Sequence, residues 1–411
     1  MKIVSSTNRR AVAQLLSATR IRDRATERKA AAIVERVRRG GDAALTKYAR
    51  DFDDLTGSIE VPQRAWEAEA RTADRSVRAA IARAARHIRS VARRQVPKGW
   101  RHTVAAGISV EQRVVPLSRV GCYVPAGRYP LPSSLLMTAV PARAAGVGEV
   151  VVCCPRPDAA VFAAAIEAGV DRLFRVGGAH AIAAMAFGTT TVPRVDKIVG
   201  PGNRWVSAAK SLISGDCGID FYAGPTEILI VTSSGQASWI AADLLAQAEH
   251  DPDARAVMIT TSRTLAERVA TEVERQMPVS GPAQHSVTRH GGIIVCPNVA
   301  DAVALANTAA SEHVVVGNES LARQIVNAGA IFVGGWTAQV AGDYAIGSNH
   351  VLPTAGAARY RGGLNAADFV KLVSVQRLTK RGLGSIGPIV TTLARAEGLE
   401  AHARSIEVRQ R

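Results

Sequence analysis

Polar residues of the kinds that bind metals or move protons cluster in the C-terminal half of the chain. Gln247 and His250 lie three residues apart at the end of an apolar, helix-forming run, so both side chains project from one helix face, as two ligands of one ion should. Glu312 and His313 adjoin at the start of a β-branched run, and a carboxylate beside an imidazole is a candidate acid/base pair. Asp343 lies in a glycine-rich loop that can hold its carboxylate near a ligand. These residue types indicate metal or proton-transfer chemistry.

Each feature also has an ordinary structural explanation. A Gln/His pair on a helix is commonly a capping or solvent-facing pair, and a Glu-His pair at a strand edge is commonly part of a surface loop. Near the C-terminus, Glu397 and His402 are typical of a solvated helix face. Spacing alone therefore leaves both explanations open.

Two glycine-rich segments invite comparison with nucleotide-binding loops. Residues 382–387 match the G-x-G-x-x-G pattern, but they follow the basic segment 377–381 instead of a core strand, and no strand–helix–strand unit follows. We predict the start of a helix there. Residues 200–203, Gly-Pro-Gly-Asn, directly follow a strand-like run, at the end of a strand where α/β sheets bind ligands. An ordinary tight turn is the alternative.

The elements that must position these residues follow from the hydrophobic pattern. Residues 1 to about 115 are predicted to be mostly helical, and the tail after about residue 363 to return to helix. Between them, β-branched runs alternate with Ala-rich helical stretches, which predicts successive parallel α/β units. The predicted strands lie within residues 147–154, 171–178, 196–202, 226–233, 255–262, 291–297 and 330–335. The predicted helices between them cover residues 134–146, 158–168, 179–187, 204–213 and 237–249.

Composition narrows the class of protein. The 411 residues are 47% hydrophobic, which suits two or three folded domains, and no window is apolar for long enough to span a membrane. Five cysteines without an export signal predict reduced thiols in a cytoplasmic protein. The formal charge of +16 raises the alternative of nucleic-acid binding, through an Arg-rich helix at residues 75–94. That helix carries no aromatic stacking platform, so we predict a solvated helix face and no nucleic-acid partner.

The order of Gln247, His250, Glu312-His313, Asp343 and His402 resembles the histidinol dehydrogenase family. The resemblance runs nearly from end to end through separate motifs. These motifs lie at residues 39–45, 123–125, 133–137, 176–179, 197–203, 223–227, 242–252, 347–354 and 396–402.

The resemblance implies two Rossmann-like parallel-sheet domains that lack the glycine fingerprint, with helical N- and C-terminal extensions, in an intertwined homodimer. The implied division is an N-terminal helical arm (1–22), a first domain with the zinc and catalytic residues (23–122 plus 228–364), a second domain on the NAD side (123–227), and a helical tail (365–411) that reaches the partner's site.

The resemblance also implies the cofactors and the site. One zinc ion per subunit would be held by Gln247, His250, Asp343 and His402, the last from the partner chain. Glu312 and His313 would be catalytic. The same four ligands would face the substrate together with Thr226, His313 and Glu397, and NAD would lie against Tyr123, His180 and Asn203.

The implied activity is the oxidation of L-histidinol to L-histidine through the aldehyde with two NAD, the last steps of histidine biosynthesis. His313 would take the alcohol proton and Glu312 would activate water for the second oxidation. Four residues depart from the family pattern, namely His180 for Gln, Thr226 for Ser, Ser311 for Pro and Ala126 for Gly. The alternative is a zinc- and NAD-dependent relative that oxidises another small alcohol, such as a sulfonated propanediol.

Overall fold

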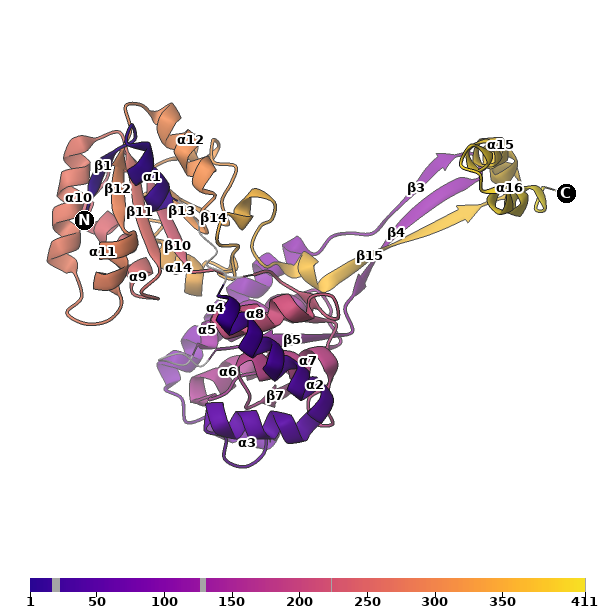
Figure 1. The fold of residues 1–411 in the computed structure, drawn as a ribbon, viewed down its shortest axis with the longest axis horizontal. Coiled ribbons are helices and arrows are strands. Elements are labelled where there is room, and N and C mark those ends of the chain that lie inside the picture. Colours follow the sequence, from indigo (N-terminus) through magenta and orange to yellow (C-terminus); the bar gives the residue numbers. More distant parts are fainter. Residues whose placement is uncertain (17–22, 126–130, 223, 411) are drawn as a thin grey trace.

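The computed structural model of the protein describes residues 1–16, 23–125, 131–222 and 224–410. Two six-stranded sheets, each flanked by helices, form the body, and a three-stranded antiparallel ribbon projects from it (Figure 1). We name these sheet A, sheet B and the ribbon. No helix in the described ranges is long and apolar enough to cross a membrane.

Sheet A is parallel throughout, with the strand order β1-β12-β11-β10-β13-β14. Its strands are β1 (Ile3–Ser5), β10 (Glu227–Val231), β11 (Arg255–Thr260), β12 (Gly292–Val295), β13 (His313–Val316) and β14 (Ala330–Val333). Its helices are α1 (Arg9–Leu16), α9 (Ala237–Ala248), α10 (Arg263–Gln276), α11 (Ala283–His290), α12 (Val299–Ala309), α13 (Glu319–Ala322) and α14 (Gln339–Tyr344).

Sheet B has the order β2-β7-β6-β5-β8-β9 and is parallel except for β2. Its strands are β2 (Glu60–Val61), β5 (Arg119–Tyr123), β6 (Glu149–Cys153), β7 (Arg172–Phe174), β8 (Lys197–Val199) and β9 (Gly218–Ile219). Its helices are α2 (Arg24–Asp53), α3 (Gln63–Ala70), α4 (Arg75–Gln95), α5 (Pro132–Ala144), α6 (Ala159–Ala168), α7 (Gly178–Phe187) and α8 (Arg204–Ile213).

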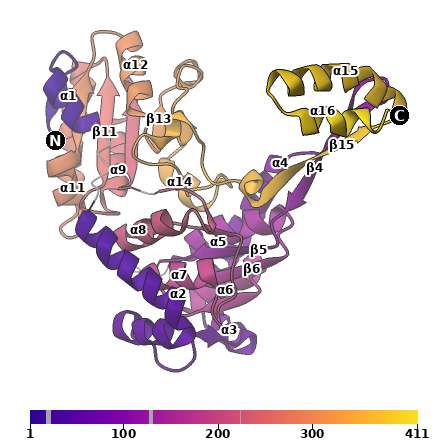
Figure 2. The ribbon, with the colours of Figure 1, turned by 45° about the vertical axis from the view of Figure 1, so that its right-hand side comes forward.

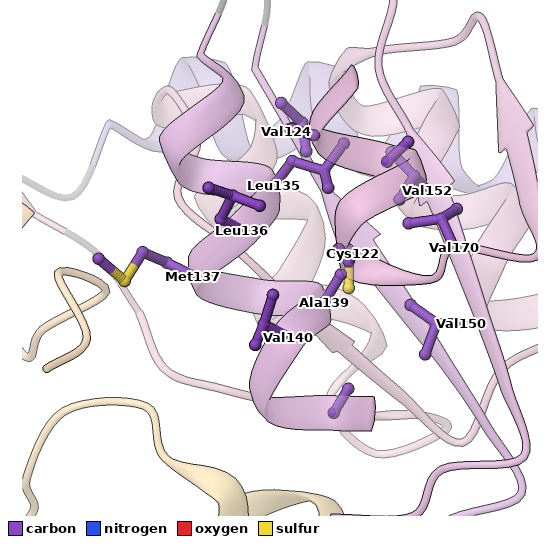
Figure 3. Close-up of a cluster of buried hydrophobic side chains, with 14 of the residues drawn as sticks. Cys122, Val124, Leu135, Leu136, Met137, Ala139, Val140, Val150, Val152 and Val170 are labelled. Carbon is purple, nitrogen blue, oxygen red and sulfur yellow. The ribbon is translucent and has the colours of Figure 1, made fainter. Parts of the chain in front are cut away.

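The core of sheet B shows why these segments fold as they do. α5 is apolar on nearly every side and is buried from Ser134 to Ala142, as expected for a helix without a polar face. Its Leu135 and Val140 lie in one cluster with Val150 and Val152 of β6 (Figure 3). Burying each such side chain stabilises the fold by roughly 1.5–3 kcal/mol.

The two sheets use the same strand order, and the chain joins them at opposite ends. Residues 220–226 connect the end of β9 in sheet B to the start of β10 in sheet A. The carboxyl edge of sheet B therefore adjoins the amino edge of sheet A, at the junction of the two lobes (Figure 2).

The ribbon consists of β3 (Trp100–Ala105), β4 (Ile108–Pro116) and β15 (Val370–Leu378), with β4 in the middle. Two helices, α15 (Lys380–Ala396) and α16 (Glu400–Glu407), sit at its far end, away from both sheets (Figure 1). We call the ribbon and these helices the arm.

Most predicted elements are confirmed. All seven strands predicted between residues 147 and 335 form, as do the five helices between them, the Arg-rich helix (α4) and the helix at residues 382–387 (within α15). The prediction that residues 1–115 and the tail are mostly helical is confirmed by α1 to α4, α15 and α16, but it missed the strands β1, β2, β3, β4 and β15.

The predicted domain division also needs correction. Residues 23–122 do not join residues 228–364, because Val34, Val37 and Leu45 of α2 pack in one cluster with Ile182 of α7. β2 pairs with β7, and β5 is a central strand of sheet B. The N-terminal segment is not a separate arm, because β1 extends sheet A, and residues 17–22 lie outside the described residues.

Candidate active site

A buried carboxyl group and a buried imidazole meet at the amino edge of sheet A. Oε2 of Glu312 accepts hydrogen bonds from the hydroxyl of Thr226 (2.5 Å) and from the backbone N–H of Glu227 (2.8 Å). Burial raises the pKa of Glu312 to about 7, despite the opposing effect of His313. A carboxyl group with such a pKa can take up and release a proton near neutral pH.

The orientation of His313 is fixed by the same neighbouring strand. Its Nδ1–H donates to the carbonyl oxygen of Glu227 (3.0 Å), which leaves Nε2 as the unprotonated nitrogen of the neutral ring. Nε2 is buried, has no hydrogen-bond partner among the described residues, and lies 3.6 Å from Oδ1 of Asp343. Burial lowers the pKa of His313, but the carboxylates of Glu312 and Asp343 outweigh it and leave the pKa above its usual value.

Gln247 lies beside this pair, at the end of α9. Its amide nitrogen donates to the hydroxyl of Thr226, so Thr226 links Gln247 to Glu312. The amide oxygen of Gln247 is buried and finds no hydrogen-bond partner within the described ranges. A buried oxygen without a hydrogen-bond partner destabilises the folded state unless a further group binds it.

Asp343 approaches His313 from α14. The side-chain amide of Gln339 donates to its Oδ2 (2.8 Å), and its backbone oxygen accepts from Nδ1 of His350 (2.9 Å). Burial raises the pKa of Asp343, but its contact with His313 outweighs that effect and lowers the pKa overall. A carboxylate held in its ionised form thus lies beside the unpartnered Nε2 of His313.

The facing edge of sheet B presents tight backbone turns. The hydroxyl of Tyr123, at the end of β5, accepts from the backbone N–H of Gly178 (3.0 Å). Gly200 has φ +119°, and a Cβ there would clash with the carbonyl oxygen of Tyr123, so this turn requires glycine. Asn203 is exposed, and its Oδ1 caps α8 by accepting from the amides of Trp205 and Val206.

Comparisons with known proteins agree along the whole chain. The family model described as histidinol dehydrogenase matches residues 17–410. A histidinol dehydrogenase of Methylococcus capsulatus is 45% identical over 409 residues, covering 96% of this chain and 92% of that protein. One of Bradyrhizobium diazoefficiens is 44% identical over 411 residues, covering 97% and 95%.

The fold agrees as well. A crystal structure of histidinol dehydrogenase from Elizabethkingia anophelis superposes with a TM-score of 0.94 at 30% identity, covering 100% of this chain and 98% of that one. The chain belongs to the histidinol dehydrogenase family. It is accordingly an oxidoreductase, and the family resemblance deduced from the sequence is confirmed.

The residues that the histidinol dehydrogenase family would use for zinc fall into two groups. Gln247 on α9 bonds Thr226, and Asp343 on α14 lies 3.6 Å from Nε2 of His313. Exposed His250 follows Gln247, near enough to His350 to interact with it electrostatically. His402 lies exposed on α16, at the end of the arm, as does Glu397 after α15 (Figure 1).

The residues present fit a zinc site of the histidinol dehydrogenase family that takes a ligand from outside the body. Within the described ranges no group of three or more His, Cys, Asp or Glu is placed to hold a metal. The observation in favour is that the amide oxygen of Gln247 and Nε2 of His313 are both buried without a hydrogen-bond partner in the described part of the chain. The carboxylate of Asp343, a further oxygen donor, lies 3.6 Å from that nitrogen.

Two features of this member of the histidinol dehydrogenase family were missed by sequence reasoning. Glu227 holds both Glu312 and His313 through its backbone, and the only signals were its place as the second residue of the predicted strand 226–233 and at the end of the motif 223–227. His180 is buried and bonded to Asp53, far from it in the sequence. Of the departures from the family pattern, Thr226 bonds Glu312, and Ala126 lies outside the described residues.

Proposed function

We propose that the chain oxidises L-histidinol to L-histidine through the aldehyde, reducing two NAD, at the junction of the two sheets. The observation that carries the proposal is the buried Glu312–His313 pair, held by the backbone of Glu227 beside Gln247 and Asp343. Such a pair offers an acid and a base at one place. The names and the end-to-end similarity of the relatives support histidinol as the alcohol.

In the first oxidation, Nε2 of His313 accepts the proton of the substrate's hydroxyl group. The carbon that carries this hydroxyl gives a hydride to NAD. The bond from Nδ1 to Glu227 keeps Nε2 free for this proton. The products of this step are the aldehyde, NADH and a protonated His313. Its neighbouring carboxylates, Glu312 and Asp343, stabilise the charge that His313 acquires.

In the second oxidation, water adds to the aldehyde carbon and Glu312 accepts a proton from that water. The hydrated aldehyde then gives its hydride to a second NAD, which leaves the carboxylic acid. The pKa of Glu312, raised to about 7 by burial, suits a group that takes one proton and releases it again.

A zinc ion would be held by Gln247, His250 and Asp343 together with His402 of the partner subunit. When bound, one ion per subunit would supply a positive charge that orients the substrate. Thr226 and Glu397 would contact the substrate with these ligands and His313. NAD would lie at the carboxyl edge of sheet B, where Tyr123, His180 and Asn203 gather.

This arrangement requires an intertwined homodimer with shared sites, which we also propose. The arm supports it, because it exposes large apolar side chains that a lone chain leaves in water. They include Trp100, Leu372, Ile389 and Leu393. A cytoplasmic location is supported by the five buried cysteines, all of which are free thiols.

The first experiment counts NADH formed per L-histidinol when histidinol is limiting, with zinc-loaded protein. Two NADH per substrate, with histidine as the product, is the expected result. A folded, zinc-loaded sample that forms no NADH would overturn the proposal. A panel of amino and sulfonated alcohols would then test the alternative substrate class.

A further inference from the structure

Where the turn between β7 and α7 meets the helix, two consecutive backbone amides bond to side chains from distant segments. The N–H of Gly177 donates to Oδ2 of Asp53 (2.8 Å), and the N–H of Gly178 donates to the hydroxyl of Tyr123 (3.0 Å). Gly178 has φ +57°, a conformation that favours glycine. The turn lies on the carboxyl edge of sheet B, and α2 and β5 hold it in place.

Asp53 is held in turn by His180. The ring Nε2–H of His180 donates to Oδ2 of Asp53 at 2.7 Å, and the two side chains are 2% and 9% exposed. The ring of His180 also lies against Tyr48 and Phe52 of α2, with ring centroids 5.9 and 6.1 Å apart. A histidine so enclosed has almost no surface to offer to a ligand.

A buried carboxylate is stable where each of its bonds is made, and becomes costly when one donor is removed. Asp53 has two donors here, the amide of Gly177 and the ring of His180, and both meet the same oxygen. Loss of the ring donor would therefore weaken the remaining hydrogen bond, from the amide of Gly177 to Asp53, and this bond fixes the turn.

We propose that His180 is a positioning residue of the NAD site, which acts through Asp53 on the amide of Gly177 and does not touch NAD. This inference rests on the proposed function, since it places NAD against the Gly177–Gly178 turn. It also accounts for the departure from the family pattern at this position. A Gln side chain carries an N–H donor that can make the same bond to Asp53.

The test is a double-mutant cycle of His180→Leu and Asp53→Asn, with His180→Gln as the conservative variant. In His180→Leu we expect the KM for NAD to rise about tenfold or more, with kcat and the KM for histidinol little changed. His180→Gln should stay near wild type. The double variant should be no worse than the more damaging single variant, because both changes break one chain of contacts.

Direct contact between His180 and NAD gives a different result. Asp53→Asn would then leave the KM for NAD near that of wild type, whereas the proposal expects it to rise as in His180→Leu, so an unaffected Asp53→Asn overturns the proposal. Met185→Leu is the matched control, because Met185 is fully buried on the same helix and the swap conserves volume. It should leave the KM for NAD near that of wild type.

A second measurement needs neither NAD nor substrate. Amide hydrogen exchange of peptides that contain Gly177 and Gly178 should quicken in His180→Leu, and match wild type in His180→Gln and Met185→Leu. If exchange is unchanged in His180→Leu, the His180–Asp53 contact does not fix the turn and the proposal is overturned. A wild type without NADH formation refutes the proposed function instead, and the exchange comparison still decides on the His180–Asp53 contact.

Discussion

Sheets A and B have the same strand order, but the candidate site residues lie at the amino ends of the strands in sheet A and at the carboxyl ends in sheet B. Sheet A presents titratable side chains at the amino ends of its strands, where Glu312 and His313 meet. Sheet B presents backbone turns at the carboxyl ends of its strands, at Gly177–Gly178 and Gly200. In the proposed function, sheet A would supply the groups that move protons and sheet B would supply a fixed surface for NAD.

The difference shows how one fold can serve two tasks. Open α/β sheets commonly bind ligands beyond the carboxyl ends of their strands, and the NAD site proposed on sheet B would follow that rule. Sheet A departs from it because the short connection 220–226 brings the chain from the carboxyl edge of sheet B directly to the amino edge of sheet A. A dinucleotide on sheet B would thereby face a substrate on sheet A.

The sharpest test of the sheet A half is Glu312→Gln. We expect the second oxidation to slow by roughly 10²–10⁴-fold, because a neutral amide cannot accept a proton from water, while the first oxidation is largely spared. Single-turnover NADH formation should show one fast equivalent and one slow equivalent. Equal loss in both steps would break the division of labour between Glu312 and His313, and exposed Glu319→Gln is the matched control.

Burial decides which strands could be predicted from the sequence. Strands such as β6, β10 and β11 are buried runs rich in β-branched residues, so their pattern is plain in the sequence. The two-residue strand β9, which is not buried, gave no such pattern. The ribbon was missed because β3 is exposed along its whole length, and an exposed strand has no buried face to mark its period.

The candidate site likewise has a part that could be predicted from the sequence and a part that could not. The Glu312-His313 pair is adjacent in the chain and is visible in the sequence, and the family motifs supply the residues around it. The contacts that fix sheet B could not be predicted, because Asp53 and His180 lie 127 residues apart and their pairing depends on how α2 packs against α7. Such long-range polar contacts leave no local pattern.

For sheet B the comparison predicts a loss of stability when a buried contact is removed. Lys210 donates to the carbonyl oxygen of Gly200 (2.6 Å) and to Oδ1 of Asp220 (2.7 Å), and Oδ2 of Asp220 accepts from the amide of Gly200 (2.8 Å). Lys210→Met leaves the buried Asp220 carboxylate without its cation, which should lower the free energy of unfolding by about 3–5 kcal/mol. Urea unfolding measures this loss.

The matched control is the exposed ion pair of Arg263 and Glu267, whose side chains are 63% and 57% exposed. Glu267→Gln should change the free energy of unfolding by less than about 1 kcal/mol. If Lys210→Met proved equally mild, the Gly200 turn would not depend on this pair, and the view of sheet B as a surface fixed by buried contacts would fail.

The last test concerns the arm. Its His402 would complete the zinc site at sheet A and would not contact sheet B. His402→Ala should weaken zinc retention against a chelator by roughly 10–100-fold without changing the KM for NAD. The exposed His102→Ala on β3 of the same arm is the control. A mutant that held zinc as tightly as wild type would remove His402 from the ligands.

Mixing subunits decides whether the ligand crosses between chains. His402→Ala has an intact body and a damaged arm, and Gln247→Ala has the reverse, so each homodimer should be inactive. In a heterodimer, the body of one chain and the arm of the other make one intact site, and random re-pairing should restore about a quarter of wild-type activity. If both residues served the same chain's site, every site in the mixture would be damaged and no activity would return.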